Sequence, residues 1–248
     1  MKLDRIIAVR NKKTIYRDGN LCIKVFNENY EKSEIFSEAT NRTIIEETGL
    51  NVPKVLEVTR VDEKWAIVYE NIKGKSISQL IKENPDKKDE YIEKMADIHM
   101  EILSKNSPQL ARMKDKMTQG IIQCELDANT RYDLHSRLEN MPKQSKLCHG
   151  DFIPSNIIIT EDGQTYIVDW ENATQGNISS DIAKTYLRFC AEDDQSGADT
   201  YLNIMCEKSG VSKETIEKWL PLVAAELSVE GNEKNKEFML SVVKSSKY

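Results

Sequence analysis

A strand–turn–strand pattern near residue 160 constrains this chain most, because the segments on either side of it read as helical. Two short apolar runs, Ile157–Ile159 and Tyr166–Val168, flank the polar turn Glu161–Gly163. This arrangement predicts a β-hairpin. Asn156 opens its first strand and Asp169 closes the second. Polar groups at strand ends can converge on one point, so an amide and a carboxylate are expected to lie close together.

The loop before this hairpin carries a second carboxylate. It reads Cys148-His149-Gly150-Asp151-Phe152-Ile153-Pro154-Ser155, so glycine and proline flank Asp151. Taken alone, a Gly-Asp loop is more often a turn than an active site. However, Asn156 and Asp169 offer the hard oxygen ligands that Mg²⁺ prefers beside substrate phosphates. A further carboxylate nearby can accept a hydroxyl proton.

The first 73 residues predict a small α+β part. Two hairpins are expected, each with apolar runs around a polar turn: Thr14–Arg17 with Leu21–Phe26, and Val55–Val61 with Trp65–Tyr69. A stretch without glycine or proline, Tyr30–Thr48, predicts a helix that stops at Gly49. The period of two along Leu21–Phe26 places Lys24 on the same side as Cys22 and Phe26.

From Ser76 onward the patterns are helical, with the embedded hairpin as the exception. Polar breaks fall near Asn84-Pro85 and Asn106–Pro108. The boundary between the two parts is expected near Gly74, which gives residues 1–73 and residues 74–248. The sequence therefore predicts an α+β protein with a sheet-rich first lobe and a mainly helical second lobe.

Composition excludes several classes of function. The net charge is −6 and the pI is about 5.3, so nothing favours nucleic acid or anionic lipid as a partner. The apolar run Ile6–Val9 is too short for a signal peptide or a membrane span. Five scattered cysteines without a CxxC pair predict neither a disulfide framework nor a zinc site. We expect a soluble, cytoplasmic protein with reduced thiols.

The motif His-Gly-Asp-x-x-x-x-Asn, a hydrophobic strand and then Asp-Trp together resemble the aminoglycoside phosphotransferase and choline kinase group. The specific part of the resemblance runs from Leu147 to Trp170. It implies a two-lobed protein-kinase-like fold, in which the small antiparallel sheet of the N-lobe carries one helix. It also implies ATP and Mg²⁺ as cofactors and the hydroxyl of a small molecule as acceptor. More narrowly, the chain looks like a small bacterial subgroup of undefined function.

Carried over residue by residue, the resemblance makes Asp151 the catalytic base that accepts the proton of the acceptor hydroxyl. Asn156 and Asp169 would hold Mg²⁺ against the nucleotide phosphates. Lys24 would contact the α- and β-phosphates. Its carboxylate partner would be Glu38 on the Tyr30–Thr48 helix, and Glu34, one turn earlier, is the competing choice.

The resemblance also implies supporting residues. Asp181 would hydrogen-bond the catalytic loop, and His149 would pack and hydrogen-bond to hold that loop rather than act as a base. Tyr69–Ile72 aligns with the hinge between the lobes, where the backbone of Glu70 and Ile72 would meet the adenine edge. His99 is expected to be a structural histidine in the core.

Some alternatives stay open. Gly19 is the only glycine before Gly49, so the glycine-rich phosphate cover of protein kinases is missing and Arg10–Thr14 would have to serve instead. A catalytically silent nucleotide-binding protein is therefore the main rival. A protein kinase is a weaker one, because no activation segment separates Asp169 from Asp181.

The acceptor itself is open among aminoglycosides, amino alcohols, sugars and amino acids. The acidic stretch Glu192–Asp194, with Glu226 and Glu230, is either a site for a cationic substrate or a solvated surface. A monomer is the default expectation.

Overall fold

The computed structural model describes residues 3, 5–10, 12–230 and 232–246, and its chain forms two compact units. The first unit comprises Met1–Gln79 and Ser155–Glu171. The second comprises Leu80–Pro154 and Asn172–Tyr248. Asn11, which belongs to the expected nucleotide cover, lies outside the described residues.

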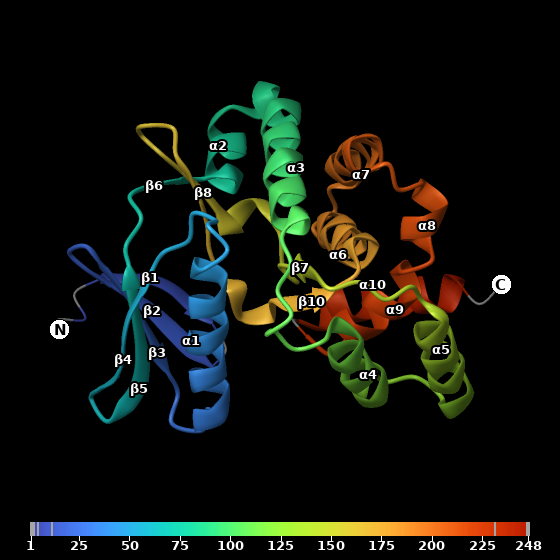
Figure 1. The fold of residues 1–248 in the computed structure, drawn as a ribbon, viewed down its shortest axis with the longest axis horizontal. Coiled ribbons are helices and arrows are strands. Elements are labelled where there is room, and N and C mark those ends of the chain that lie inside the picture. The colour runs from blue at the N-terminus through green and yellow to red at the C-terminus, as the bar shows by residue number, and fades with distance from the viewer. Residues whose placement is uncertain (1–2, 4, 11, 231, 247–248) are drawn as a thin grey trace. The chain divides into compact units, whose positions relative to one another are not determined.

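The first unit is built on a five-stranded antiparallel sheet in the order β1-β2-β3-β5-β4. Helix α1 runs along one face of this sheet (Figure 1). The elements are β1 (Arg5–Arg10), β2 (Lys13–Asp18), β3 (Leu21–Phe26), α1 (Lys32–Glu46), β4 (Val55–Val61) and β5 (Lys64–Glu70). Both predicted hairpins and the predicted helix are present.

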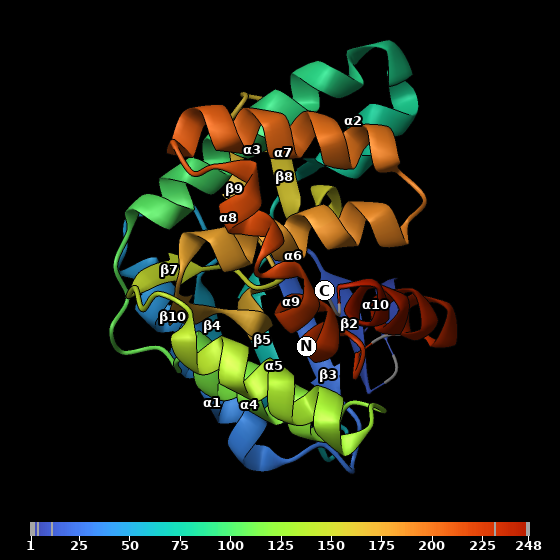
Figure 2. The same ribbon diagram turned by 90° about the vertical axis from the view of Figure 1, so that its right-hand side faces the viewer.

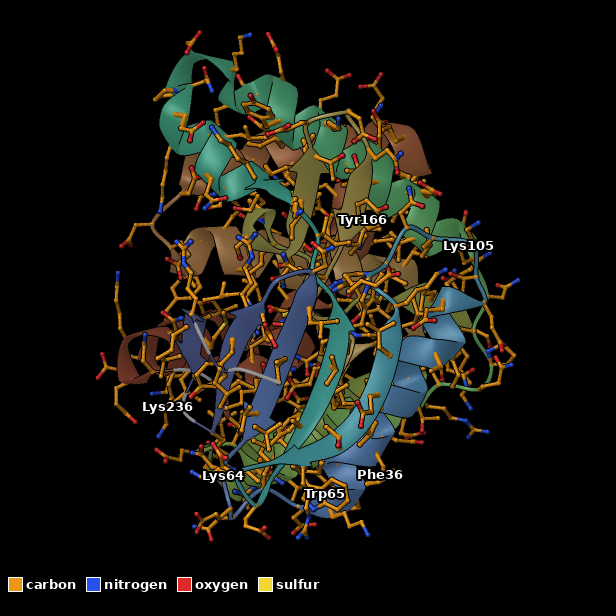
Figure 3. All side chains as sticks on the ribbon, turned by 90° about the vertical axis from the view of Figure 1, so that its left-hand side faces the viewer. Phe36, Lys64, Trp65, Lys105, Tyr166 and Lys236 are labelled. Atoms are coloured by element: carbon orange, nitrogen blue, oxygen red, sulfur yellow. The ribbon has the colours of Figure 1, made fainter. Side chains whose placement is uncertain are left out.

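The two faces of the sheet follow the period of two. Phe26, Ile67 and Tyr69 pack with Ile35 and Ala39 of α1. Phe36 of α1 also meets Trp65 near the start of β5, with ring centroids 5.4 Å apart (Figure 3). The face between sheet and α1 is therefore apolar, and Lys24, which shares it with Phe26, is buried among these side chains.

A second, three-stranded sheet in the first unit carries the hairpin near residue 160. Its order is β6-β8-β9, formed by β6 (Gly74–Ser76), β8 (Ile157–Thr160) and β9 (Thr165–Ile167). Ile167 also donates a backbone hydrogen bond to the carbonyl of Asn51. These bonds tie the hairpin to the first unit, whereas the sequence division had grouped it with residues 74–248.

The second unit is mainly helical. In Figure 2, α6 and α7 lie side by side, as do α4 and α5. Its elements are α3 (Lys88–Ser104), α4 (Met113–Gln123), α5 (Ala128–Asn140), α6 (Ile178–Ala191), α7 (Gln195–Ser209), α8 (Lys213–Glu217), α9 (Leu220–Leu227) and α10 (Glu233–Ser245), with the short strands β7 (Lys146–Cys148) and β10 (Thr174–Gly176). Helix α2 (Ile77–Glu83) spans the boundary between the units.

Close packing of α4 on α9 depends on one glycine. A side chain on Gly120 of α4 would place its Cβ 2.8 Å from the Cα of Glu226 on α9. Real Cβ atoms do not approach backbone atoms so closely, so the two helices can meet here only without a side chain. Among the described residues, no helix combines the length and the apolar character needed to cross a membrane.

Candidate active site

The first unit places a buried ion pair between strand β3 and helix α1. The Nζ atom of Lys24 lies 2.5 Å from Oε1 of Glu38, and the two side chains are 4% and 3% exposed. The hydroxyl of Tyr69 donates to the same oxygen over 2.9 Å. Of the two candidates on α1, Glu38 rather than Glu34 thus makes the pair. A buried charge needs a partner of this kind, because burial alone disfavours the ionised form.

Two further carboxylates approach Lys24. Its Nζ atom lies 3.7 Å from Oδ1 of Asp169 and 3.5 Å from Oε2 of Glu171. Burial alone would lower the pKa of Lys24, but Glu38, Asp169 and Glu171 together raise it to about 12. The ammonium group therefore keeps its charge.

The hairpin of the three-stranded sheet brings Asn156 and Asp169 to the same end. Ile157 pairs with Ile167, and the amide of Val168 donates to the carbonyl of Asn156 over 2.9 Å. Asp169 follows directly, with a φ of 63° and a side chain that is 36% exposed. Such a backbone conformation is uncommon outside glycine, and strain of this kind clusters at functional sites.

The donor set of these two residues fits Mg²⁺. One carboxylate and one amide oxygen are hard ligands, and Mg²⁺ takes few of them from the protein because it keeps water and phosphate ligands. Within the described part of the chain, no three His, Cys, Asp or Glu side chains gather as a metal site.

The predicted hinge lies at the end of β5. The backbone amide of Glu70 donates to Lys54, and its side chain accepts a hydrogen bond from the Lys54 amide over 3.2 Å. Ile72 lines a cavity of about 530 Å³ in the first unit. Its other walls are Asn20, Asn71, Lys73, Thr160, Glu161, Asp162 and Tyr166. The cavity thus joins the hinge to the β8–β9 hairpin.

The second unit fixes the backbone of the His-Gly-Asp loop through Asp181. The carboxylate of Asp181, on the first turn of α6, accepts the amides of His149 over 2.7 Å and Gly150 over 2.8 Å. Its other buried contact is Nε2 of His99, at 3.1 Å. Burial alone would raise the pKa of Asp181, but the hydrogen bond and charge of His99, with smaller effects of His149 and Lys184, hold it at about 2.

The loop itself has two further constraints. Gly150 has a φ of 79°, and a Cβ there would lie 2.3 Å from the carbonyl oxygen of Asn172. Glycine is therefore required at this position on both counts. Nδ1 of the buried His149 accepts the amide of Asp151 over 3.2 Å. His149 accordingly supports the loop from within.

Asp151 is oriented by an arginine. Nε of Arg188, on α6, lies 3.0 Å from Oδ1 of Asp151, and Nη2 of the same side chain donates to Glu230 over 3.0 Å. The side chains of Arg188 and Asp151 are each 19% exposed. The guanidinium group thus links the loop to the turn that follows α9.

Four of the five acidic residues that could have formed a cationic-substrate site, all but Glu192, are paired within the second unit. Asp194 lies 2.5 Å from Lys88, Asp193 lies 2.6 Å from Lys234, and Glu226 lies 2.8 Å from Lys184. Glu230 pairs with Arg188, as described above. These pairs stabilise the helical unit and give no support to a cationic-substrate site there.

Sequence reasoning missed three residues that contact the site: Tyr69 as a hydrogen-bond donor, Glu171 and Arg188. Lys13 lay within the expected Arg10–Thr14 cover, but its pairing with Glu171 was not predicted. Lys13 and Glu171 pair across 158 positions of the chain. No local pattern links residues so distant. The one available signal was the position of Glu171, two residues after Asp169.

Comparisons place the chain in a family. Residues 8–211 match the phosphotransferase enzyme family, and the chain belongs to that family. This match covers most of the sequence and includes both Lys24 and the loop that carries Asp151. No curated protein matches the sequence significantly.

Solved structures share the fold. The choline kinase LicA from Streptococcus pneumoniae has a TM-score of 0.65 at 18% identity, covering 98% of this chain and 94% of that one. A thermostable mutant of aminoglycoside phosphotransferase APH(4)-Ia, in ternary complex with AMP-PNP and hygromycin B, has a TM-score of 0.70 at 12% identity, with coverages of 98% and 93%. An aminoglycoside-3'-phosphotransferase of type VIII has a TM-score of 0.63 at 16% identity, with coverages of 90% and 93%. The predicted kinase-like fold is therefore confirmed.

Proposed function

We propose that the protein is an ATP-dependent phosphotransferase that moves the γ-phosphoryl group to a hydroxyl of a small molecule. The observation that carries this proposal is the cluster around Lys24. A charged, buried lysine lies 2.5 Å from Glu38 and 3.7 Å from Asp169, so the groups to which we assign phosphate and metal binding lie close together in the first unit. Bound AMP-PNP in the related APH(4)-Ia structure adds support for a nucleotide.

In this proposal each group has one task. Lys24 offsets the charge of the α- and β-phosphates, and Glu38 orients it. Asn156 and Asp169 would hold Mg²⁺, which neutralises phosphate charge when bound. The backbone at Glu70 and Ile72 meets the adenine edge.

Asp151 acts on the acceptor. Its carboxylate accepts the hydroxyl proton while the hydroxyl oxygen bonds to the γ-phosphorus and the bond to the bridging oxygen breaks, which releases ADP. Asp181 and His149 keep the loop in place for this step. Positioning and charge neutralisation supply most of the rate in such reactions.

The acceptor class spans aminoglycosides, amino alcohols, sugars and amino acids. We place the enzyme in the cytoplasm, because ATP is supplied there and its five free cysteines would stay reduced. A monomer is sufficient for the chemistry, since one chain supplies both Asp151 and Asp169.

The test compares Asp151→Asn with the parent protein and with Asp133→Asn, a control at an exposed carboxylate of α5. ADP formation is measured across a panel of acceptors from the four classes, and ATP binding is followed by thermal shift with and without Mg²⁺. We expect Asp151→Asn to lose nearly all turnover and to keep nucleotide binding. The control Asp133→Asn should keep both. Equal turnover in both variants would refute the role of Asp151, and nucleotide binding without turnover on any acceptor would favour the silent nucleotide-binding protein.

A further inference from the structure

A second lysine reaches the carboxylate that contacts Lys24. Lys13, the first residue of β2, forms an ion pair with Oε2 of Glu171. The same oxygen lies 3.5 Å from Nζ of Lys24, and the hydroxyl of Tyr30 donates to Oε1 over 3.2 Å. The side chains of Lys13 and Glu171 are 14% and 30% exposed. Two shielded ammonium groups thus share one carboxylate oxygen.

An anion is needed where two such cations meet. Like charges a few ångströms apart repel strongly when water is excluded, and a shared anion removes that cost. Glu171 serves as the anion, because its Oε2 pairs with Lys13 and lies 3.5 Å from Nζ of Lys24. The oxygens of a triphosphate carry the same charge sign and are strong acceptors for lysine, so they can take the place of this carboxylate.

The sequence before β2 explains why a side chain, rather than backbone amides, would bind the phosphates. The first glycine of the chain is Gly19, which lies in the β2–β3 turn. Backbone amides approach phosphates closely when glycine leaves room for them, as in the cover loop of protein kinases. Without glycine there, a lysine side chain is the available donor, and Lys13 is the lysine that points into the cluster.

We propose that Lys13 is a second phosphate-binding lysine, which holds the nucleotide triphosphate together with Lys24. Before the nucleotide binds, the carboxylate of Glu171 occupies the position of the phosphate oxygens, and these oxygens displace it on binding. This inference rests on the proposed nucleotide-dependent function.

The test measures the affinities of the parent protein and its variants for adenosine, AMP and ATP by titration calorimetry. Lys13→Met should bind ATP about tenfold or more weakly, the loss expected for one hydrogen bond to a charged group, and should bind adenosine as the parent does. Lys13→Arg should keep most of the ATP affinity. The matched control is Lys64→Met, which removes a strand lysine that also faces a glutamate, at the exposed end of the β4–β5 hairpin (Figure 3).

Glu171→Gln provides the opposite perturbation, because it removes the competing anion. This variant should bind ATP several-fold more tightly than the parent, and weaker binding would contradict the exchange. If the parent binds ATP and Lys13→Met binds it equally well, the role of Lys13 is refuted while the proposed function stands. Equal losses for adenosine and ATP would also refute it, and a parent that binds no adenine nucleotide would refute both.

Discussion

Replacing Asp181 with asparagine should destabilise the helical unit and change how its stability depends on pH. The carboxylate accepts three buried hydrogen bonds, from the amides of His149 and Gly150 and from His99. Asparagine offers one acceptor oxygen and an NH₂ group, so at least one buried donor would face another donor. An unsatisfied buried group costs about 1–3 kcal/mol.

The charge of Asp181 adds a second contribution. Its pKa of about 2, against the usual 3.8, corresponds to about 2 kcal/mol in favour of the ionised folded state, at roughly 1.4 kcal/mol per pKa unit. A lowered carboxyl pKa contributes stability above 3.8, and this contribution falls as the pH drops from 3.8 toward 2. About half of it should be gone at pH 3. Together the two contributions predict a loss of about 3–5 kcal/mol at pH 7.

Urea unfolding followed by far-ultraviolet circular dichroism measures this loss, because the helices lie mainly in the second unit. The parent, Asp181→Asn and Asp97→Asn are compared at pH 7 and at pH 3. Asp97 is an exposed carboxylate of α3 that pairs with Lys208, so its variant should unfold like the parent. The difference between parent and Asp181→Asn should shrink at pH 3. A difference that is absent at pH 7, or equal at both pH values, would refute the reasoning.

Three further changes address the remaining contacts. With ATP present, Mg²⁺ should raise the melting temperature of the protein further, and Asp169→Ala should remove most of this extra increase. An unchanged Mg²⁺ effect in thermal shift would exclude Asp169 as a Mg²⁺ ligand. Tyr69→Phe deletes the 2.9 Å hydrogen bond to Glu38, so KM for ATP should rise up to about tenfold while the melting temperature changes little; steady-state kinetics decide this. Arg188→Met removes the partner of Asp151, so kcat should fall about tenfold to a hundredfold at unchanged KM for ATP, and an equal kcat would show that Asp151 is positioned without it.

Local patterns predicted most elements of the first unit and the residues that face one another in it. The period of two placed Lys24 beside Phe26, and that is the face on which α1 packs. The hairpin prediction likewise placed Asn156 and Asp169 at one end of β8 and β9. Strand β1 was not predicted, because a short apolar run between charges carries no turn signal of its own.

Some contacts between distant segments could not be predicted. Arg188 looks like any solvated helix arginine until α6 is placed against the loop of Asp151. Lys13 is one of several lysines near the N-terminus, and its pairing with Glu171 depends on how the second sheet meets the first. The grouping of the hairpin with the first unit also arises from backbone bonds, such as Ile167 to Asn51, that have no side-chain signature.

Helix α6 carries a pattern of polar residues that is present in the sequence but does not by itself reveal what those residues contact. Asp181 accepts the loop amides, the hydroxyl of Thr185 donates to the carbonyl of Phe152 over 2.9 Å, and Arg188 contacts Asp151. The spacing of i, i+4 and i+7 puts these three polar residues on one face of the helix. Each successive turn of α6 therefore contacts the loop once, and the loop backbone is positioned along two full turns of a rigid element. A polar stripe on an otherwise buried helix indicates a buried polar partner, and here that partner is the loop carrying the proposed base.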